Sequence, residues 1–447
     1  MTAVSVGAPR QFIDRGWPAV GATIDIDGHS LDVYYRASQG PLPISAAPFA
    51  LNALAPAMKI GQPLHIETPL PAAALAMLSR AQAFMRVGHT YLSEIRIDAV
   101  ELPSATPPDA AQQDRRGVGL YFSGGVDSFY SLLKHRKEIT HVVFVHGFDT
   151  LLANPSVRER NVRAMRQAAA EFGKPLIEIE TNVRTQLDAH ERWSHHTALS
   201  LQMALAQVLG LQLKKIYLAE NYDYIARWTP DEVANGFITG GADVFLDGTD
   251  CLRLDKTAYI ATSDTAMRWL RVCWQNQDRA LNCGHCEKCI RTMIALHLAG
   301  ALSRCRTFDQ PLDLQRIRYL RFGQFGNFWP ELLLELERRG DQPELAEAVR
   351  DSIGWATIPP NTWNLTLTGL ETRGGQPDLL RVTRERMAQA EATGLTREQA
   401  DRLCKAVSRS LDLETELKII KSSQSWKLTA PLRSAGLRLR RLRSGIR

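Results

Sequence analysis

The hydrophobic positions between residues 118 and 221 fall into short apolar runs that alternate with longer segments of helical spacing. Four runs have the length and composition of buried strands: VGLYF, HVVFVHGF, PLIEIETN and KKIYLAEN. The segments between them place apolar residues at intervals of three and four, as amphipathic helices do: DSFYSLLKHRKE, SVRERNVRAMRQAAAEFG and HHTALSLQMALAQVLGL. Strands that alternate with helices in this way predict an α/β fold, a parallel sheet with helices on both faces.

The residues before this region predict a small α+β domain, which we place at 1–105. ATIDIDGHSLDVYYRAS alternates apolar and polar residues on both sides of Asp27-Gly28, a pattern that predicts a β-hairpin. LHIETP and YLSEIRIDAVEL predict strands, and PAAALAMLSRAQAFM predicts a helix that opens with proline. The domain lacks catalytic spacing, so we expect a packing or substrate-presenting module. The polar, proline-containing segment 106–117 predicts a linker to the α/β domain at 118–305.

The pattern after residue 305 is mostly helical. Apolar residues recur at helical intervals through residues 306–420, and TWNLTLTG interrupts them as an extended piece. We expect a packing or oligomerisation layer, so an oligomer is possible. In the tail, residues 421–447, arginines alternate with leucines. Such a tail could lie on an anionic membrane surface, bind a partner, or be a solvated terminus.

Composition and charge place the chain among globular proteins of two or three domains. It has 447 residues, of which 45% are hydrophobic and 23% are charged. The net charge of +6 includes six arginines after Pro431, so the basic excess is mostly an effect of the tail and we expect no nucleic-acid partner. No apolar run approaches the roughly 20 residues of a membrane span, and the first residues lack a signal core, so we expect a cytoplasmic protein.

The first predicted strand of the α/β region runs into SGGVDS, residues 123–128. Gly124 and Gly125 allow a sharp turn that exposes backbone N–H groups, Val126 follows them, and the next helix begins at Asp127 and Ser128. N–H groups and the positive end of a helix dipole would together bind an anion such as phosphate. The hydroxyl groups of Ser123 and Ser128 could donate to the same oxygens, and Asp127 suggests a shared Mg²⁺. The alternative is a purely structural glycine turn.

Four of the seven cysteines lie within seventeen residues, in the order Cys273, Cys283, Cys286 and Cys289. Their C-x9-C-x2-C-x2-C spacing suits four thiolates around one tetrahedral Zn²⁺, a closed structural site without a position for catalytic water. His285 could substitute for one cysteine. The alternatives are an iron–sulfur cluster and a chance group of buried thiols.

SGGVDS resembles the SGGxDS pyrophosphate loop of the N-type ATP pyrophosphatases, the PP-loop family. With the cysteine pattern, the resemblance is closest to the 7-cyano-7-deazaguanine synthases of queuosine biosynthesis, and it covers roughly residues 117–302. It implies an adenine nucleotide alpha-hydrolase-like parallel sheet, with ATP, Mg²⁺ and Zn²⁺ as cofactors and residues 123–128 as the phosphate-binding loop. That family adenylates a carboxylate, lets ammonia displace AMP, and then converts the amide into a nitrile.

The same resemblance implies roles for four further segments of the chain. HGFDT stands where relatives hold the adenosine, which makes His146 and Asp149 candidates; the alternative for His146 is a hydrogen-bonded histidine at a strand end. LAENYDY stands near ATP and substrate in the family, which makes Asn221 and Asp223 candidates. In DGTDCLRLDKTAYIA, Lys256 would balance charge on the α-phosphate and join Asp127 as a catalytic residue; the alternative is a surface lysine.

The sequence therefore predicts an ATP-dependent ligase whose partners are a small-molecule carboxylate and ammonia or an amine. Two alternatives stay open. One is the same ATP chemistry on another small molecule or on a glycan precursor, because SWKLTAPLR resembles a segment near the ends of some bacterial glycosyltransferases of surface polysaccharide synthesis. The other is a nucleotide-binding scaffold without turnover.

Overall fold

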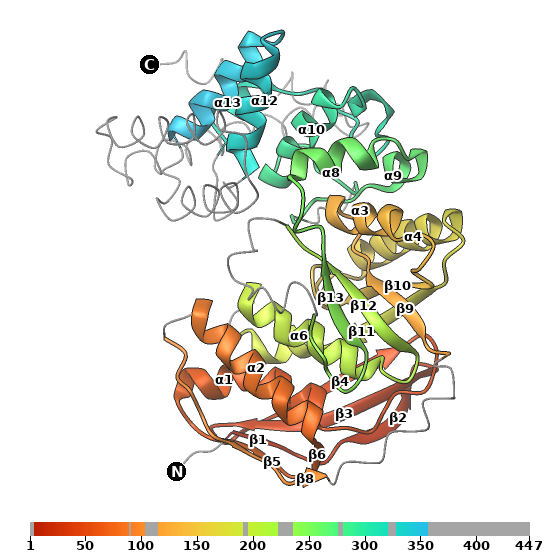
Figure 1. Cartoon of the computed structure of the whole chain (residues 1–447), viewed down its shortest axis with the longest axis vertical. Coiled ribbons are helices and arrows are strands. Elements are labelled where there is room, and N and C mark those ends of the chain that lie inside the picture. Colours follow the sequence, from red (N-terminus) through yellow and green to blue (C-terminus); the bar gives the residue numbers. More distant parts are fainter. Residues whose placement is uncertain are drawn as a thin grey trace, which may run out of the picture. The chain divides into compact units, whose positions relative to one another are not determined.

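The computed structural model of the chain describes residues 4–88, 91–102, 115–190, 195–221, 236–275, 280–320 and 328–355 (Figure 1). Of these, the residues up to Pro311 belong to one compact unit, and those from Leu312 onwards belong to a second. All strands and all described candidate site residues lie in the first unit.

Five parallel strands form the centre of the first unit. They are β9 (Gly117–Tyr121), β10 (His141–His146), β11 (Leu176–Thr181), β12 (Leu213–Ala219) and β13 (Asp243–Asp247). Their order in the sheet is β13-β12-β9-β10-β11 (Figure 1). The four strands predicted from sequence are confirmed. The prediction missed β13, a five-residue strand, DVFLD, with an aspartate at each end.

The helices predicted between these strands are also confirmed. They are α3 (Val126–Lys134), α4 (Pro155–Glu171) and α6 (His195–Val208), with a short α5 (Val183–Leu187) before the last. After β9 the chain adds β10 and β11 on one side, then crosses to add β12 and β13 on the other. In such a doubly wound sheet ligands bind beyond the carboxyl ends of the strands, where the strand order reverses. Here that point lies between β9 and β12.

The N-terminal strands extend the same sheet. β4 (His29–Ala37) pairs antiparallel with β11, so the order continues through β4, β3 (Trp17–Ile26), β1 (Val4–Val6), β5 (Leu64–Ile66) and β7 (Ile97–Asp98). β2 (Arg10–Asp14) pairs with β3 and completes a mixed, mostly parallel sheet of eleven strands. A separate pair joins β6 (Leu70–Pro71) to β8 (Glu101–Leu102). The predicted division at residues 106–117 therefore does not interrupt the main sheet.

Two predictions in the N-terminal part have different outcomes. The hairpin is confirmed, because Ile26 pairs with His29 around Asp27 and Gly28, whose φ angles of 54° and 78° suit a two-residue turn. The strand predicted over YLSEIRIDAVEL is wrong in extent, since only Ile97–Asp98 and Glu101–Leu102 pair as strands.

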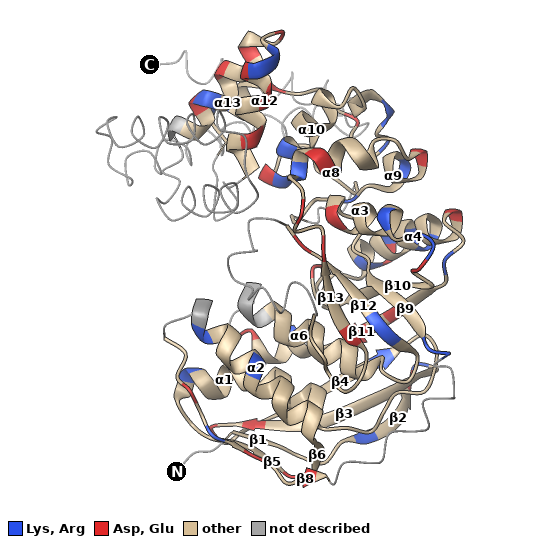
Figure 2. Cartoon of the chain, viewed as in Figure 1, with Lys and Arg blue, Asp and Glu red and all other residues tan. Residues whose placement is uncertain are grey.

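The most buried helix of the N-terminal part was not predicted. α1 (Ala47–Ile60) contains Pro56 and carries a single charged residue, Lys59 (Figure 2). A helix that is apolar on all sides lacks the amphipathic spacing by which helices are recognised, and it is stable only when surrounded by protein. Here α1 packs with α2 (Ala72–Gly88), which was predicted, and with α6 in the main hydrophobic core.

Helices follow the last strand. In the first unit these are α8 (Arg253–Ile260), α9 (Asp264–Trp269), α10 (Glu287–Leu298) and the 3₁₀ turn η2 (Leu302–Arg304). The second unit contains α11 (Leu314–Arg318), α12 (Trp329–Arg339) and α13 (Pro343–Trp355), so the predicted C-terminal helices are confirmed as far as residue 355. TWNLTLTG, the later helical pattern and the basic tail lie outside the described residues. Within the described residues, no helix is both long and apolar enough to cross a membrane.

Candidate functional site

The glycine loop, residues 123–128, lies directly beyond the carboxyl end of β9. Gly124 has a φ of 77°, in the left-handed region, and Gly125 is the extended N-cap residue of α3. A Cβ atom on Gly124 would lie 2.5 Å from the end of the Met165 side chain. The first glycine therefore permits the turn, and the second begins the helix whose positive dipole end faces the loop.

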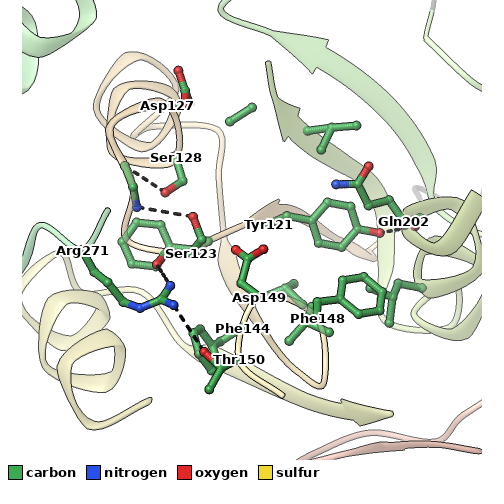
Figure 3. A pocket seen from close by; sticks show the side chains of 17 residues that line it. Tyr121, Ser123, Asp127, Ser128, Phe144, Phe148, Asp149, Thr150, Gln202 and Arg271 are labelled. Atoms are coloured by element: carbon green, nitrogen blue, oxygen red, sulfur yellow. Dashed lines mark hydrogen bonds between the residues drawn. The ribbon is translucent and has the colours of Figure 1, made fainter. Parts of the chain in front are cut away.

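The two serines of the glycine loop hold its shape. The backbone N–H of Gly125 donates to Ser123 Oγ at 3.3 Å, and Ser128 Oγ donates to the Gly125 carbonyl at 3.1 Å (Figure 3). In this state both hydroxyl groups bond within the loop.

Arg271 fixes the loop from a distant part of the chain, and the sequence analysis missed it. Its backbone N–H donates to the Gly124 carbonyl at 2.7 Å. Its guanidinium donates to the Ser123 carbonyl at 3.4 Å and to Thr150 Oγ1 at 3.3 Å (Figure 3). Burial lowers the pKa of Arg271, while the nearby Asp149 carboxylate acts in the opposite direction. A buried cation thus lies beside the loop.

Asp127 forms two ion pairs with α8. Lys256 Nζ lies 3.0 Å from Asp127 Oδ1, and Arg253 Nη1 lies 2.6 Å from Asp127 Oδ2. The Lys256 side chain is 0% exposed and also donates to the carbonyl of Glu220, so it is not a surface lysine. Burial by itself would raise the pKa of Asp127, but Arg253 and Lys256 more than offset this effect and hold the pKa well below its usual range.

Arg253 is a second residue that the sequence analysis missed. It precedes Lys256 by three residues, so both side chains extend from the same face of α8. Arg253 also donates to Asn221 Oδ1 at 3.3 Å, so Asn221 and Asp127 share Arg253 as a partner. Asp223, the other candidate in that segment, lies outside the described residues.

A cavity of about 180 Å³ opens beside the glycine loop, at the carboxyl ends of β9, β10 and β12. Its polar lining includes Ser123, Asp127, Ser128, Asp149, Thr150 and Arg271 (Figure 3). Aromatic and aliphatic side chains form the remainder, among them Tyr121, Phe144, Phe148 and Leu218. An apolar hollow with a few converging polar groups is typical of a small-molecule site.

His146 does not line this cavity. Its Nε2 atom lies 3.3 Å from Glu178 Oε2, and its ring packs edge-on against Phe144. The side chain lines a separate cavity under α4. Of the two candidates in HGFDT, the structure therefore brings Asp149 to the glycine loop and places His146 elsewhere.

The four predicted metal ligands come together. The Sγ atoms of Cys273, Cys283, Cys286 and Cys289 all lie within 4.8 Å of one another. Sγ of Cys283 lies 3.8 Å from Sγ of Cys289, and the edge of a tetrahedron with Zn–S bonds of about 2.3 Å is also about 3.8 Å. Sulfur atoms this close fit around a single ion such as zinc and leave no room for a cluster of several iron atoms with inorganic sulfide.

Helix α10 contributes two of the four cysteines of this cluster. Cys286 is the N-cap residue of α10 and Cys289 lies in its first turn, where the helix dipole stabilises negative charge. Hydrogen bonds from the other three sulfur atoms, Cys273 first, hold the pKa of Cys283 far below its usual range, whereas hydrogen bonds within the cluster, again with Cys273 first, raise the pKa of Cys286 and of Cys289. His285 is not part of the cluster, and its Nδ1 lies 2.8 Å from the Cys283 carbonyl.

Asn282 joins the two parts of the cluster and is a third residue that the sequence analysis missed. Its Oδ1 accepts from the backbone N–H groups of Val272 and Cys273, at 2.8 and 3.1 Å. Its Nδ2 donates to the Leu270 carbonyl and to Thr307 Oγ1, at 2.8 and 2.9 Å. The amide therefore fixes the backbone on both sides of Arg271 and links the cluster to the glycine loop.

Comparison of the chain with protein-family models, with curated proteins and with solved structures finds no match in any of the three. What can be concluded about function therefore comes from the chemistry of the glycine loop, the α8 cations and the four-cysteine cluster.

Proposed function

We propose that the protein is an ATP pyrophosphatase that adenylates a small-molecule carboxylate and then passes the acyl group to ammonia or an amine. The observation that carries this proposal is the glycine loop itself. It lies beyond the carboxyl end of the central strand, where the strand order reverses, with Gly124 in the left-handed region and Gly125 at the start of α3. This geometry suits phosphate groups.

The cations near the loop support binding of several phosphates. Lys256 and Arg253 reach Asp127 from α8, and the guanidinium of Arg271 donates to the Ser123 carbonyl of the loop. In the proposed reaction a carboxylate oxygen of the substrate attacks the α-phosphorus, and the bond to the bridging oxygen breaks. Pyrophosphate then leaves with the electron pair. Fixed positive charges stabilise the negative charge that develops on the transferring and leaving oxygens.

The aromatic part of the cavity supports a nucleotide rather than free pyrophosphate. Tyr121, Phe144 and Phe148 line the cavity together with the polar groups, and the Tyr121 hydroxyl donates a hydrogen bond to the Gln202 carbonyl at 2.6 Å. These rings offer apolar surface against which an adenine base could pack next to the glycine loop.

The nitrogen step needs little from the protein beyond exclusion of water. The amine attacks the acyl carbon of the adenylate, the bond between that carbon and the AMP oxygen breaks, and AMP leaves while a proton passes to solvent. We propose 7-carboxy-7-deazaguanine with ammonia as the first substrate pair to test, because the loop and cysteine pattern resemble the synthases that use it. A different carboxylate or a glycan precursor is the alternative within the same chemistry.

Two metals belong to the proposal. The four-cysteine cluster would hold Zn²⁺ in a closed, structural site. Mg²⁺, when bound with ATP, would neutralise phosphate charge near Asp127. Because both oxygens of Asp127 already face cations, this residue has a further role: it holds Lys256 and Arg253 next to the phosphate site.

The test is pyrophosphate release from ATP in the presence of Mg²⁺, ammonia and the candidate carboxylate. Asp127→Asn keeps the size of the side chain and removes its charge, and we expect it to abolish release. The matched control is Asp264→Asn, which removes a carboxylate from a surface ion pair with Arg304. Undiminished pyrophosphate release by a folded Asp127→Asn variant would sink the enzyme proposal.

A nucleotide-binding protein without turnover is the second candidate, and one observation favours it. With both carboxylate oxygens paired to Arg253 and Lys256, Asp127 must give up part of this pairing before it can bind Mg²⁺. ATP binding in calorimetry without pyrophosphate release, across a panel of carboxylates, would support this candidate. Release with a carboxylate other than the deazaguanine would instead support the alternative substrate.

A further inference from the structure

A second cavity, of about 430 Å³, lies under the N-terminal half of α4, above β10, β11, β4 and the start of β3. Side chains along β11 point alternately to the two faces of the sheet, and those on one face form the polar floor of this cavity. Ile177 and Ile179 belong to the hydrophobic core on one face of the sheet, so Glu178 and Glu180 between them point to the other face. In register, His146 of β10 lies beside Glu180, and Glu180 lies beside Arg36 of β4. A row of buried polar side chains therefore crosses three strands.

The two buried glutamates in this cavity already have partners. Arg166 donates to both oxygens of Glu178, at 2.7 and 2.8 Å, and His146 completes the set. Glu180 accepts from Arg36 at 2.5 Å, from the Tyr34 hydroxyl at 2.9 Å and from Arg158. The carboxylate oxygens of Glu178 and Glu180 therefore already accept hydrogen bonds from other side chains of the protein.

Two guanidinium donors have no acceptor. Arg36 Nε and Arg158 Nε are buried and have no hydrogen-bond partner among the described residues. His146 Nδ1 also has no partner there, but because Nε2 faces the Glu178 carboxylate, Nδ1 of the neutral ring is an acceptor and not a donor. The side chains of Arg36 and His146 are 6% and 5% exposed. An arginine has five N–H groups, so a carboxylate cannot use all of them, and each buried donor without an acceptor costs free energy. Stacking against Trp17, 5.6 Å from the Arg36 guanidinium to the ring centre, restricts how Arg36 can turn to find one.

We propose that this cavity binds a small ligand through an oxyanion, a phosphate or a carboxylate group, held by Arg36 and Arg158. Oxyanions offer several acceptor atoms in the geometry that guanidinium groups match. The cavity also lies at the N-terminal half of a helix of 17 residues, whose dipole favours negative charge. Asp14 pairs with Arg36 from outside the cavity, so the charges of the cluster nearly balance and the unused donors, rather than net charge, select the ligand.

The position of the site suggests what its ligand would affect. The connection between β10 and α4, residues 147–154, carries Phe148, Asp149 and Thr150 into the cavity beside the glycine loop. The same connection leads into Pro155 and Arg158, which line the second cavity. A ligand under α4 would therefore contact the element that forms one wall of the other cavity. The proposal does not depend on the reaction proposed above.

The test is titration of the whole protein with inorganic phosphate, and separately with malonate, by calorimetry. Arg158→Gln is compared with Arg163→Gln, a control on the same helix whose side chain is 72% exposed and lies outside the cavity. Arg158→Gln removes a charged donor group from the cavity, so we expect the dissociation constant of one class of anion sites to rise at least tenfold, or that class to disappear. The control Arg163→Gln should bind both anions as the wild type does. The glycine loop is unchanged in both variants, so any anion bound there contributes equally. The arm that binds more tightly, phosphate or malonate, identifies the class of oxyanion.

Equal stoichiometry and affinity for both anions in the wild type and in folded Arg158→Gln would overturn the proposal. Should Arg158→Gln fail to fold, crystals of the wild-type protein soaked in tungstate decide the question through anomalous scattering. Tungsten next to Arg36 and Arg158 supports the site. Tungsten confined to the glycine loop, or absent, overturns it.

Discussion

Replacing Asp127 by alanine should destabilise the fold as well as the proposed reaction. Asp127 is the carboxylate paired with Lys256, whose side chain is 0% exposed, and with Arg253, whose side chain is 11% exposed. In Asp127→Ala the ammonium of Lys256 loses its carboxylate partner and keeps its hydrogen bond to the Glu220 carbonyl, and the charge stays buried. The variant therefore leaves uncompensated positive charge between α3 and α8.

The expected loss is large for a single substitution. Removing one partner of a buried ion pair typically costs about 3–5 kcal/mol, because the remaining charge has lost its counter-ion. A second substitution, Lys256→Met, removes that charge while keeping a side chain of similar length. The double variant should recover most of the loss, since replacing a buried ion pair by apolar groups is often close to neutral.

Urea denaturation followed by circular dichroism measures these differences. Asp264→Ala serves as the matched control, because the Asp264 side chain is 77% exposed in its ion pair with Arg304, and exposed pairs contribute about 0–1 kcal/mol. The reasoning fails if Asp127→Ala is as stable as the control, or if adding Lys256→Met to it brings no recovery. It also follows that Asp127→Asn, checked for folding, is the better variant for the activity test.

The pairing of Asp127 also predicts a pH dependence. Its pKa in the folded protein is held below the unfolded value of about 3.9. Stability from the pair is therefore fully present above that unfolded value and is lost as pH falls toward the lower folded value. The difference in unfolding free energy between wild type and Asp127→Ala should be constant from about pH 8 to 5 and shrink below about pH 4. A difference that already shrinks between pH 8 and 6 would point to another titrating group.

Three further predictions concern the glycine loop and the metal site. Asn282→Ala should weaken zinc binding roughly 10–100-fold in chelator competition, as loss of a supporting hydrogen bond does elsewhere; unchanged affinity would contradict its role. Gly124→Ala should lower the unfolding free energy by about 1–2 kcal/mol because its φ is 77°, and Gly125→Ala, with φ negative, should cost less; equal costs in urea denaturation would refute this. Stripping metal with a chelator should lower the melting temperature and added zinc should restore it; an unchanged melting temperature would remove the structural role.

The sequence predicted the parts of the fold in which local pattern and burial agree. The βα alternation after residue 117 was clear because each strand is a short apolar run and each helix has one apolar face. α1 was missed because it is apolar all round and contains Pro56, and β13 because five residues with two aspartates lack a strand signal. That β4 joins β11 could not be read locally, since pairing between strands so distant in the chain leaves no periodicity in either.

The candidate site was predictable where a motif is contiguous. The glycine turn stands within six residues and the cysteine pattern within seventeen, and the structure brings the four thiols together. Arg253, Arg271 and Asn282 belong to no such pattern, because their roles depend on which distant backbone they meet after folding. His146 shows the opposite failure: its place after a strand suggested the nucleotide, but the alternation of β10 turns its side chain toward Glu178.

The bond between Arg271 and the glycine loop has a consequence for how the protein is made. Arg271 follows Ser123 by 148 residues, a stretch that a ribosome needs roughly 7 to 30 s to synthesise at about 5–20 residues per second. During that interval the nascent turn lacks the amide and guanidinium groups that will later hold it. Incomplete chains released before residue 271 should therefore lack the groups that hold the turn, and the proposed nucleotide site would be complete only once the cysteine-rich segment has emerged.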